Sequence, residues 1–275
     1  IKEVMNGVPN SRRTSIVEPN LGGTPKTFAD FFAGIGLMRM GLERRGWRIL
    51  FAIDIDPRKK EMYAGHFRDA EEHYIVEDVH RLHAEQVPTV SLATASFPCN
   101  DLSVAGARCG LGGKQSSAFW GFVRVLKEMS HRPPLVLLEN VVGFLTSRKG
   151  KDFELALLAL NDLGYSVDAF IIDAANFVPQ SRKRLFVVGV LDGESAERDS
   201  HWRLQSEPVS SDVRPKALVE FIVSHPHIRW RLRNLPPLPT RETRLEDILE
   251  DLPDNAPEWW SRERAAYLLS QMSPR

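Results

Sequence analysis

"TFADFFAGIG", residues 27–36, is an apolar strand pattern that ends on a turn with two glycines. The residues that follow, 37–46, have the apolar spacing of a helix, so the stretch predicts a strand, a tight turn and a helix. Gly34 and Gly36 would let a ligand approach the backbone, and the start of the helix offers unpaired N–H groups. The spacing is not G-x-G-x-x-G, so it does not indicate a dinucleotide pyrophosphate site. On the glycines alone, a turn that binds nothing is equally consistent.

The same alternation of apolar runs and helical spacing continues along the chain. Candidate strands lie at 27–32, 48–54, 89–97, 134–140, 166–173 and 184–191, and candidate helices lie at 37–46, 57–67, 117–130 and 152–164. Continuous apolar strands that alternate with helices predict an α/β fold, with a mostly parallel sheet covered by helices on both faces. In such sheets, ligands bind at the carboxyl ends of the strands.

Composition limits the classes of protein and of site. The 275 residues contain 36 basic and 36 acidic side chains, so a nucleic-acid surface would have to be local. Two cysteines, Cys99 and Cys109, make neither a disulfide framework nor a zinc site. No apolar run reaches membrane length. We therefore expect a cytoplasmic protein without a metal site or membrane contact.

Acidic side chains close to the predicted strand ends indicate a nucleoside cofactor. Asp54 ends the second predicted strand, where a carboxylate can hold two ribose hydroxyls. A glycine turn with a ribose acid and no phosphate-binding loop favours S-adenosylmethionine over NAD. Asp78 follows a short apolar run and could face the adenine, although an ordinary surface acid would look the same.

"SFPCNDLS", residues 96–103, places Cys99 directly after Pro98, where an apolar run gives way to a polar loop. Most free cysteines are small buried hydrophobes, which is one interpretation of Cys99. The other is a nucleophile exposed at the end of the sheet. Its thiol would need activation, because an ordinary cysteine with a pKa of about 8.5 is only slightly ionised at neutral pH.

Two further groups fall close to the same predicted edge. Glu139 and Asn140 end the apolar run "PLVLLEN", where a buried carboxyl could donate a proton; a helix cap or an ion pair is the alternative for Glu139. Gln180, Arg182 and Arg184 stand at alternate positions entering a strand and would share one face. Planar guanidinium groups suit a phosphate or a base carbonyl.

"DFFAGIG", "SFPCNDLS", "LLENV" and "QSRKR", in this order, resemble the motifs of the DNA cytosine-5 methyltransferase family over residues 27–191. The resemblance implies the Rossmann-like fold of S-adenosylmethionine-dependent methyltransferases, acting on double-stranded DNA in a bacterial restriction–modification system, associated with the nucleoid. S-adenosylhomocysteine would be the product. The implied cofactor contacts are Phe32, Ala33, Gly34, Ile35, Gly36, Asp54, Ile55, Asp78, Phe97, Pro98 and Ser117.

The resemblance also assigns catalytic and substrate-binding roles. Cys99 would be the nucleophile, Glu139 the acid on a flipped cytosine and Arg184 a partner of the base. The remaining implied residues are Arg182, which would brace the catalytic site, and Asn100, Ser103, Asn140, Val141 and Gln180 on the substrate side. Three positions depart from the family pattern: Asp54 where Glu is usual, Ile55 where an aromatic is frequent, and Asn100 where Gln is usual. None of these departures removes a catalytic group.

We expect three regions: an arm over 1–26, a cofactor-binding and catalytic domain over 27–191, and a helical and irregular extension over 192–275 leading toward a target recognition region. Residues 227–241 could lie along phosphates through Arg229, Arg231, Arg233 and Arg241, or form a solvated strand and turn. Residues 244–253 and 259–272 have helical patterns and are expected to pack through Ile248, Leu249, Trp259 and Leu268.

The family's final motifs are not found after residue 191; "DNAP", residues 254–257, lacks their glycine. We therefore expect a trimmed chain, or a split enzyme whose second polypeptide carries the missing motifs. Such a chain by itself would bind DNA weakly and with little sequence preference. Two alternatives stay open: a cofactor-binding subunit that is inactive without its partner, and a transfer-RNA cytosine-5 methyltransferase, whose Cys-Phe-Thr signature is not found here.

Overall fold

The computed structural model describes residues 25–98, 117–192, 208–253 and 255–272. Its centre is a seven-stranded sheet in the order β3-β2-β1-β4-β5-β7-β6. The strands are β1 Thr27–Phe31, β2 Arg48–Asp54, β3 Tyr74–Val76, β4 Leu92–Ala95, β5 Leu135–Val141, β6 Tyr165–Asp173 and β7 Lys183–Leu191. The predicted mostly parallel, Rossmann-like sheet is confirmed, with β4 shorter than its apolar run suggested.

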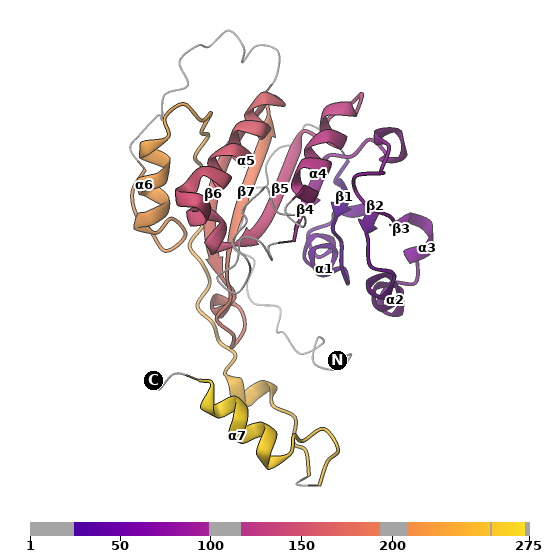
Figure 1. Ribbon diagram of the computed structural model, residues 1–275, viewed down its shortest axis with the longest axis vertical. Coiled ribbons are helices and arrows are strands. Elements are labelled where there is room, and N and C mark those ends of the chain that lie inside the picture. The colour runs from indigo at the N-terminus through magenta and orange to yellow at the C-terminus, as the bar shows by residue number, and fades with distance from the viewer. Residues whose placement is uncertain (1–24, 99–116, 193–207, 254, 273–275) are drawn as a thin grey trace.

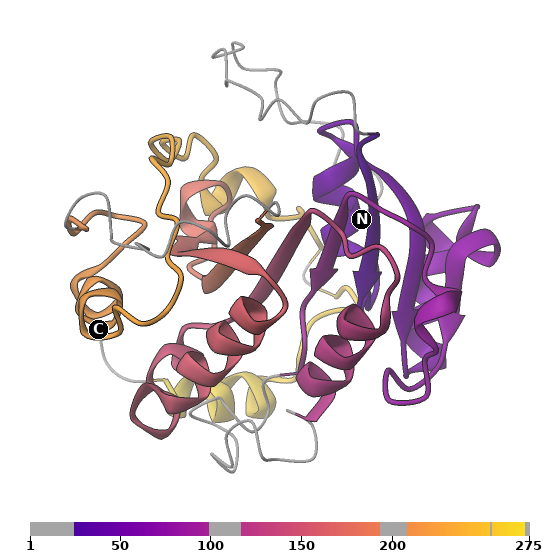
Figure 2. The same cartoon turned by 90° about the horizontal axis from the view of Figure 1, so that it is seen from above.

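Helices cover both faces of the sheet (Figures 1 and 2). The helices are α1 Leu37–Glu43, α2 Pro57–His66, α3 Ala70–His73, α4 Ser117–Glu128, α5 Lys151–Asp162, α6 Lys216–Ser224 and α7 Arg262–Ser270. Short 3-10 turns lie at Ala84–Gln86, Ala174–Asn176 and Leu245–Ile248, and a longer, kinked 3-10 segment spans Val142–Gly150. On one face α4 and α5 bury Phe122 and Leu157 in the larger apolar core. On the other, Tyr63 of α2 and Phe67, the residue after it, pack with Phe28 in a second, smaller core.

Strand β7 decides which residues reach the edge where the parallel strands end. Of the described strands, it is the one that runs antiparallel to both neighbours, β5 and β6. Its first residues therefore lie beside the last residues of β5, and Arg184 pairs in register with Val141. Asp173 organises the loop before β7 by accepting hydrogen bonds from Ala175 N (3.0 Å) and Arg182 N (2.7 Å). These bonds, that from Ala175 first, lower the pKa of Asp173.

The turn after β1 depends on backbone conformations that favour glycine. Phe32, Gly34 and Gly36 have φ values of 61°, 55° and 89°. A Cβ on Gly36 would lie 2.4 Å from the Phe67 ring and 2.8 Å from the Tyr63 ring, closer than real contacts allow. Gly36 therefore permits the start of α1 to pack directly against α2 and the residue that follows it.

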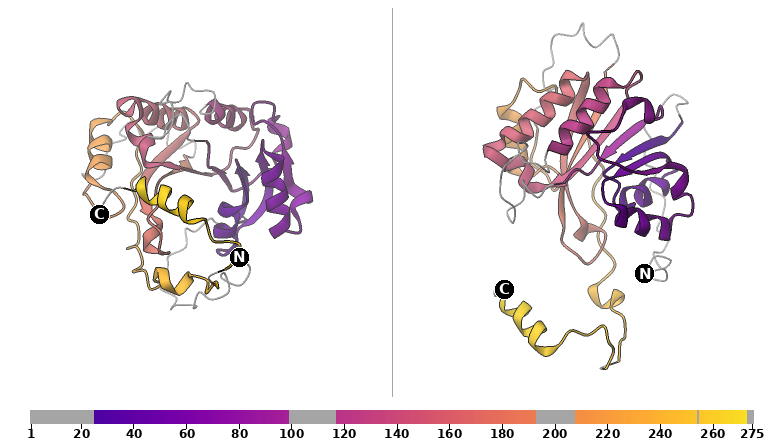
Figure 3. Two further views of the ribbon diagram at one scale, coloured as in Figure 1. Left: turned by 60° about the horizontal axis from the view of Figure 1, so that its bottom comes forward. Right: turned by 45° about the vertical axis from the view of Figure 1, so that its right-hand side comes forward.

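The C-terminal part corrects one prediction. Helix α7 forms inside the predicted range and 244–253 contains a short 3-10 turn, but neither packs as expected. Leu249 is 67% exposed and Trp259 is 55% exposed, and Ile248 and Leu268 are also exposed. Figures 1 and 3 show α7 projecting away from the sheet, and none of these four side chains joins an apolar core of the described residues.

Part of the 227–241 stretch adds to the outer edge of the sheet. Trp230 forms a parallel bridge with Val167 of β6 and is 7% exposed. The carbonyl of Arg229 accepts from Val167 N at 2.9 Å, and Arg231 N donates to Val167 O at 2.8 Å. This portion is therefore an isolated β-bridge with a buried Trp230, not the solvated strand that was one of the two expectations. No described helix is long and apolar enough to cross a membrane.

We predict that Gly36→Ala destabilises the protein by roughly 2–4 kcal/mol, because it adds left-handed strain to a steric clash with two aromatic rings. Urea unfolding followed by circular dichroism measures the loss. Gly41→Ala is the matched control: it lies in α1, and a Cβ there would meet nothing within 4 Å. That change should stabilise the protein by about 0.5–1 kcal/mol. Equal effects of the two substitutions would contradict the packing role of Gly36.

Candidate active site

A cavity of about 630 Å³ lies where the parallel strands end. This volume falls within the range of small-molecule sites in proteins. Residues from the ends of β1, β2, β4 and β5 and from the start of β7 enclose it. The lining residues are Phe32, Ile53, Asp54, Ile55, Lys59, Glu77, Asp78, Val79, His80, Ser96, Phe97, Pro98, Ala118, Glu139, Asn140, Val141, Arg182 and Arg184.

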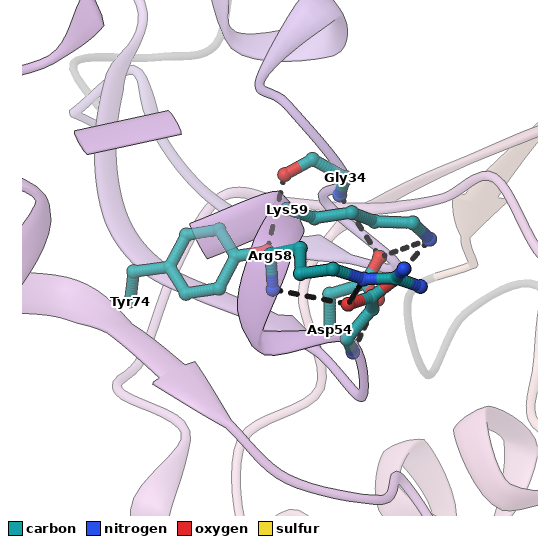
Figure 4. Close-up of polar contacts among 6 residues, drawn as sticks. Gly34, Asp54, Arg58, Lys59 and Tyr74 are labelled. Carbon is teal, nitrogen blue, oxygen red and sulfur yellow. Dashed lines mark hydrogen bonds and ion pairs between the residues drawn. The ribbon is translucent and has the colours of Figure 1, made fainter. Parts of the chain in front are cut away.

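Asp54 is the most densely hydrogen-bonded group of this cavity wall (Figure 4). It is 4% exposed, and its Oδ2 accepts from Gly34 N at 3.1 Å while its Oδ1 accepts from Asp56 N at 3.0 Å. Lys59 Nζ contacts both oxygens, Oδ2 at 3.0 Å and Oδ1 at 3.2 Å. The carboxylate therefore ties the end of β2 to the glycine turn and to the first turn of α2.

Tyr74 supports the same turn from the other side. Its hydroxyl donates to the carbonyl of Gly34 at 3.1 Å, and burial raises the pKa of this phenol well above its ordinary value. Tyr74 thus stays a donor throughout the physiological pH range. Gly34 is held at both its N–H, by Asp54, and its C=O, by Tyr74, so the turn is fixed before any ligand binds.

Apolar side chains and one further acid form the wall around Asp54. Phe32, Ile55 and Phe97 line the cavity, and Ile55 is 65% exposed whereas Phe97 is 3% exposed. Asp78 is half-buried and accepts from His80 N at 2.9 Å, which fixes its carboxylate at the cavity. Flat apolar walls beside a carboxylate suit a nucleoside, whose base is apolar on its faces and whose ribose donates hydrogen bonds.

Glu139 and Arg184 form a charged pair in the wall contributed by β5 and β7. Arg184 Nε lies 2.9 Å from Glu139 Oε1, and the two side chains are 20% and 24% exposed. The ion pair that was the alternative for Glu139 is thus present, and its carboxyl is half-buried where full burial was expected. The antiparallel start of β7 brings the guanidinium to the same face as Glu139.

Asn140, the next residue of β5, anchors the backbone that follows β4. It is 4% exposed; its Nδ2 donates to Phe97 O at 3.2 Å, and its Oδ1 accepts from Val141 N at 2.8 Å. Its amide is therefore used to join β5 to the backbone one residue before Pro98. Asn140 thus has a positioning contact, and both Asn140 and Val141 line the cavity.

The other predicted site residues fall into three groups. Arg182 and Pro98 line the cavity, whereas Gln180 is exposed and does not line it. The turn residues Ala33, Gly34, Ile35 and Gly36 lie next to Phe32 but are not among the lining residues. Cys99, Asn100 and Ser103 lie outside the described residues, and Ser117 begins α4, its side chain likewise outside the description.

Residues that sequence reasoning missed include Lys59 and Asp30. Lys59 follows Asp54 in the first turn of α2, a spacing that could have revealed the pair. Asp30 lies within the apolar β1 pattern and is 1% exposed. Its Oδ1 accepts from Thr94 Oγ1 at 2.6 Å, while its Oδ2 has no hydrogen-bond partner among the described residues. Burial raises the pKa of Asp30 to about 7, and the nearby Asp54 charge adds to the rise.

In the described residues, no group of three or more His, Cys, Asp or Glu side chains could hold a metal ion.

We predict a pH dependence of stability from Asp30. Between about pH 4 and pH 7 the folded state holds a proton that the unfolded chain releases, so stability falls as pH rises through about 7. Asp30→Asn removes this titration and should gain about 2–3 kcal/mol relative to wild type between pH 5 and pH 8. Urea unfolding at the two pH values measures the change. Asp162→Asn, at an exposed carboxyl on α5, is the control; a pH-independent difference for Asp30→Asn would refute the buried-proton account.

Comparison with known proteins gives one family. The family model described as C-5 cytosine-specific DNA methylase matches residues 26–267. The Type II methyltransferase M.DsaV of Dactylococcopsis salina is 35% identical over 166 residues, covering 60% of this chain and 46% of that protein. The Type II methyltransferase M.BanI of Aneurinibacillus aneurinilyticus is 34% identical over 171 residues, covering 60% of this chain and 38% of that protein. The chain thus spans less than half the length of these two relatives.

Solved structures agree on the fold. The S. pombe Dnmt2 methyltransferase is 27% identical with a TM-score of 0.50, covering 61% of this chain and 52% of that one. The Entamoeba histolytica methyltransferase EhMeth is 20% identical with a TM-score of 0.53, covering 67% of this chain and 57% of that one. The second likeness supports the fold alone.

Proposed function

The chain belongs to the C-5 cytosine-specific DNA methylase family, and from that premise we propose that it transfers a methyl group from S-adenosylmethionine to carbon-5 of cytosine in double-stranded DNA. The observation that carries the proposal is one cavity with Asp54 in one part of its wall and the Glu139–Arg184 pair in another. We further propose a role in bacterial restriction–modification, acting on nucleoid DNA in the cytoplasm. The Type II methyltransferase relatives support that role.

The residues that line the cavity fit S-adenosylmethionine. Asp54 would accept from the ribose hydroxyls, Phe32 and Ile55 would face the adenine, and Asp78 would approach its polar edge. Neither a phosphate-binding glycine motif nor an arginine stands at the glycine turn, which agrees with a cofactor that has no phosphate. When bound, this cofactor supplies an electrophilic methyl group on its sulfonium.

The protein's own residues would make cytosine reactive. Carbon-5 becomes nucleophilic when the Cys99 thiolate adds to carbon-6, forming an S–C bond and pushing an electron pair into the ring. Glu139 would favour that addition by giving a proton or hydrogen bond to ring nitrogen-3, while Arg184 holds the Glu139 carboxyl and contacts the base. After carbon-5 has taken the methyl group, loss of its proton and departure of the thiolate restore the ring. The base must leave the duplex first, at a cost of a few kcal/mol.

Sequence recognition is a separate part of the proposal. Because the chain spans 46% of M.DsaV and 38% of M.BanI, more than half of such a protein lies outside the match. We propose that choice of a DNA sequence requires elements from that remaining part, on the same or on a second polypeptide. A cofactor-binding subunit without activity of its own is the corresponding alternative.

The nucleophile gives the first functional test. Cys99→Ser should lower methyl transfer by roughly 10³-fold or more, since serine forms no comparable thiolate, while cofactor binding stays near normal. Transfer of radiolabelled methyl groups to duplex DNA measures this, with transfer RNA assayed in parallel. Cys109→Ser is the control and should keep full activity. Substantial turnover with serine at position 99 would rule out the covalent mechanism, and methylation of transfer RNA alone would change the substrate class.

The second functional test concerns Asp54, the carboxylate proposed to hold the ribose. Asp54→Ala should weaken S-adenosylmethionine binding by roughly 1–3 kcal/mol, because the ribose hydroxyls lose their acceptor. Isothermal titration calorimetry on the purified chain measures the affinity, with NAD as the comparison ligand. An unchanged affinity in the variant, or tight binding of NAD, would show that Asp54 does not hold this ribose.

A further inference from the structure

Every acceptor position of the Asp54 carboxylate is already in use. An ionised carboxylate has about four lone-pair positions. Two are taken by the backbone N–H groups of Gly34 and Asp56, and two by the contacts of Lys59 Nζ, at 3.0 and 3.2 Å. Figure 4 shows the Lys59 side chain extended toward the carboxylate. A ribose that donates two hydroxyl hydrogen bonds to Asp54 therefore needs positions that Lys59 holds.

The two kinds of partner differ in how easily they can leave. The N–H groups belong to the braced glycine turn and to the N-cap of α2, so they are fixed by the fold. The Lys59 side chain is 45% exposed against 3% for Asp54, so its ammonium can move into water on a flexible stem. Its neighbour Arg58 is engaged with Asp56 at 3.1 Å and does not contact Asp54 in its place.

Resting on the proposed cofactor site, we propose that Lys59 competes with the ribose hydroxyls for Asp54 and so sets the affinity for the nucleoside. Binding of the nucleoside exchanges the Lys59 ammonium for the two hydroxyls. A ligand that offers both hydroxyls restores both hydrogen bonds, whereas a ligand that lacks them gives Asp54 nothing in return and leaves the ion pair in place. Lys59 thus lowers the affinity for a nucleoside that carries both hydroxyls and narrows its advantage over one that lacks them.

The position of Lys59 on α2 agrees with this role. The first turn of a helix disfavours cations because of the partial positive charge at its amino end. Lys59 stands in that turn, which contains no acidic residue to offset it. The lysine therefore contributes little to α2 itself, and its removal should leave the helix intact.

Calorimetry with S-adenosylhomocysteine on the full chain tests the proposal. Lys59→Met should bind this nucleoside roughly two- to fivefold more tightly than wild type, the scale of one half-exposed ion pair. For the 2′,3′-dideoxy analogue the same substitution should change affinity by less than about twofold, because that ligand does not displace the ammonium. Raising KCl from about 0.05 to about 0.5 M should tighten wild-type binding and leave the variant unchanged, since salt weakens the pair.

Lys60→Met is the matched control: Lys60 lies on the same helix and pairs with Glu71 at 2.8 Å. It should leave affinity for both ligands unchanged. Weaker binding by Lys59→Met would overturn the proposal and make Lys59 a ribose contact; equal binding would show that it does not compete. If Asp54→Ala weakens binding but Lys59→Met has no effect, the inference fails and the cofactor site stands. Absence of any nucleoside binding by the wild-type chain would overturn both.

Discussion

The direction of the strands is the constraint on which the candidate site depends. Parallel strands end on one edge of the sheet, so Asp54 of β2, Pro98 after β4 and Glu139 of β5 gather there without any long-range signal in the sequence. β7 is inserted antiparallel between β5 and β6, which carries Arg184 to the same edge. Because β7 alone among these strands runs the other way, Arg184 lies beside Glu139, and the cavity wall contains an ion pair in place of a lone acid.

Two buried aspartates, Asp30 in β1 and Asp54 at the end of β2, have different roles. Asp54 is surrounded by four donor contacts, which hold the glycine turn and keep its charge at the cavity. Asp30 has one donor, Thr94, and a second oxygen without a hydrogen-bond partner in the described part of the chain, so burial favours its protonated form. The protein thus keeps a charge at the cavity wall and avoids a second one just behind it, where the two would repel.

The sequence could predict the parts of this structure that follow from local pattern. The alternation of apolar runs and helical spacing is enough for the sheet and its helices, and the residues at the run ends are enough for most of the cavity wall. The partners of individual side chains were harder to predict. The spacing of Lys59 after Asp54 allows their ion pair but does not require it, and the partner of Glu139 depends on the direction of β7. Asp30 was missed because a single acid in an apolar strand looks like a tolerated exception. The packing of Trp259 and Leu268 was predicted wrongly because helical periodicity indicates an apolar face and not what covers it.

The central claim is that one cavity binds the nucleoside at Asp54 and presents the cytosine to the groups beside Glu139. The crystal structure of the chain with S-adenosylhomocysteine tests it most directly. The account predicts the ribose hydroxyls on the Asp54 carboxylate, the adenine between Phe32 and Ile55, and the thioether sulfur directed toward the Glu139–Arg184 pair. A nucleoside bound elsewhere, or one whose ribose lies away from Asp54, would contradict it.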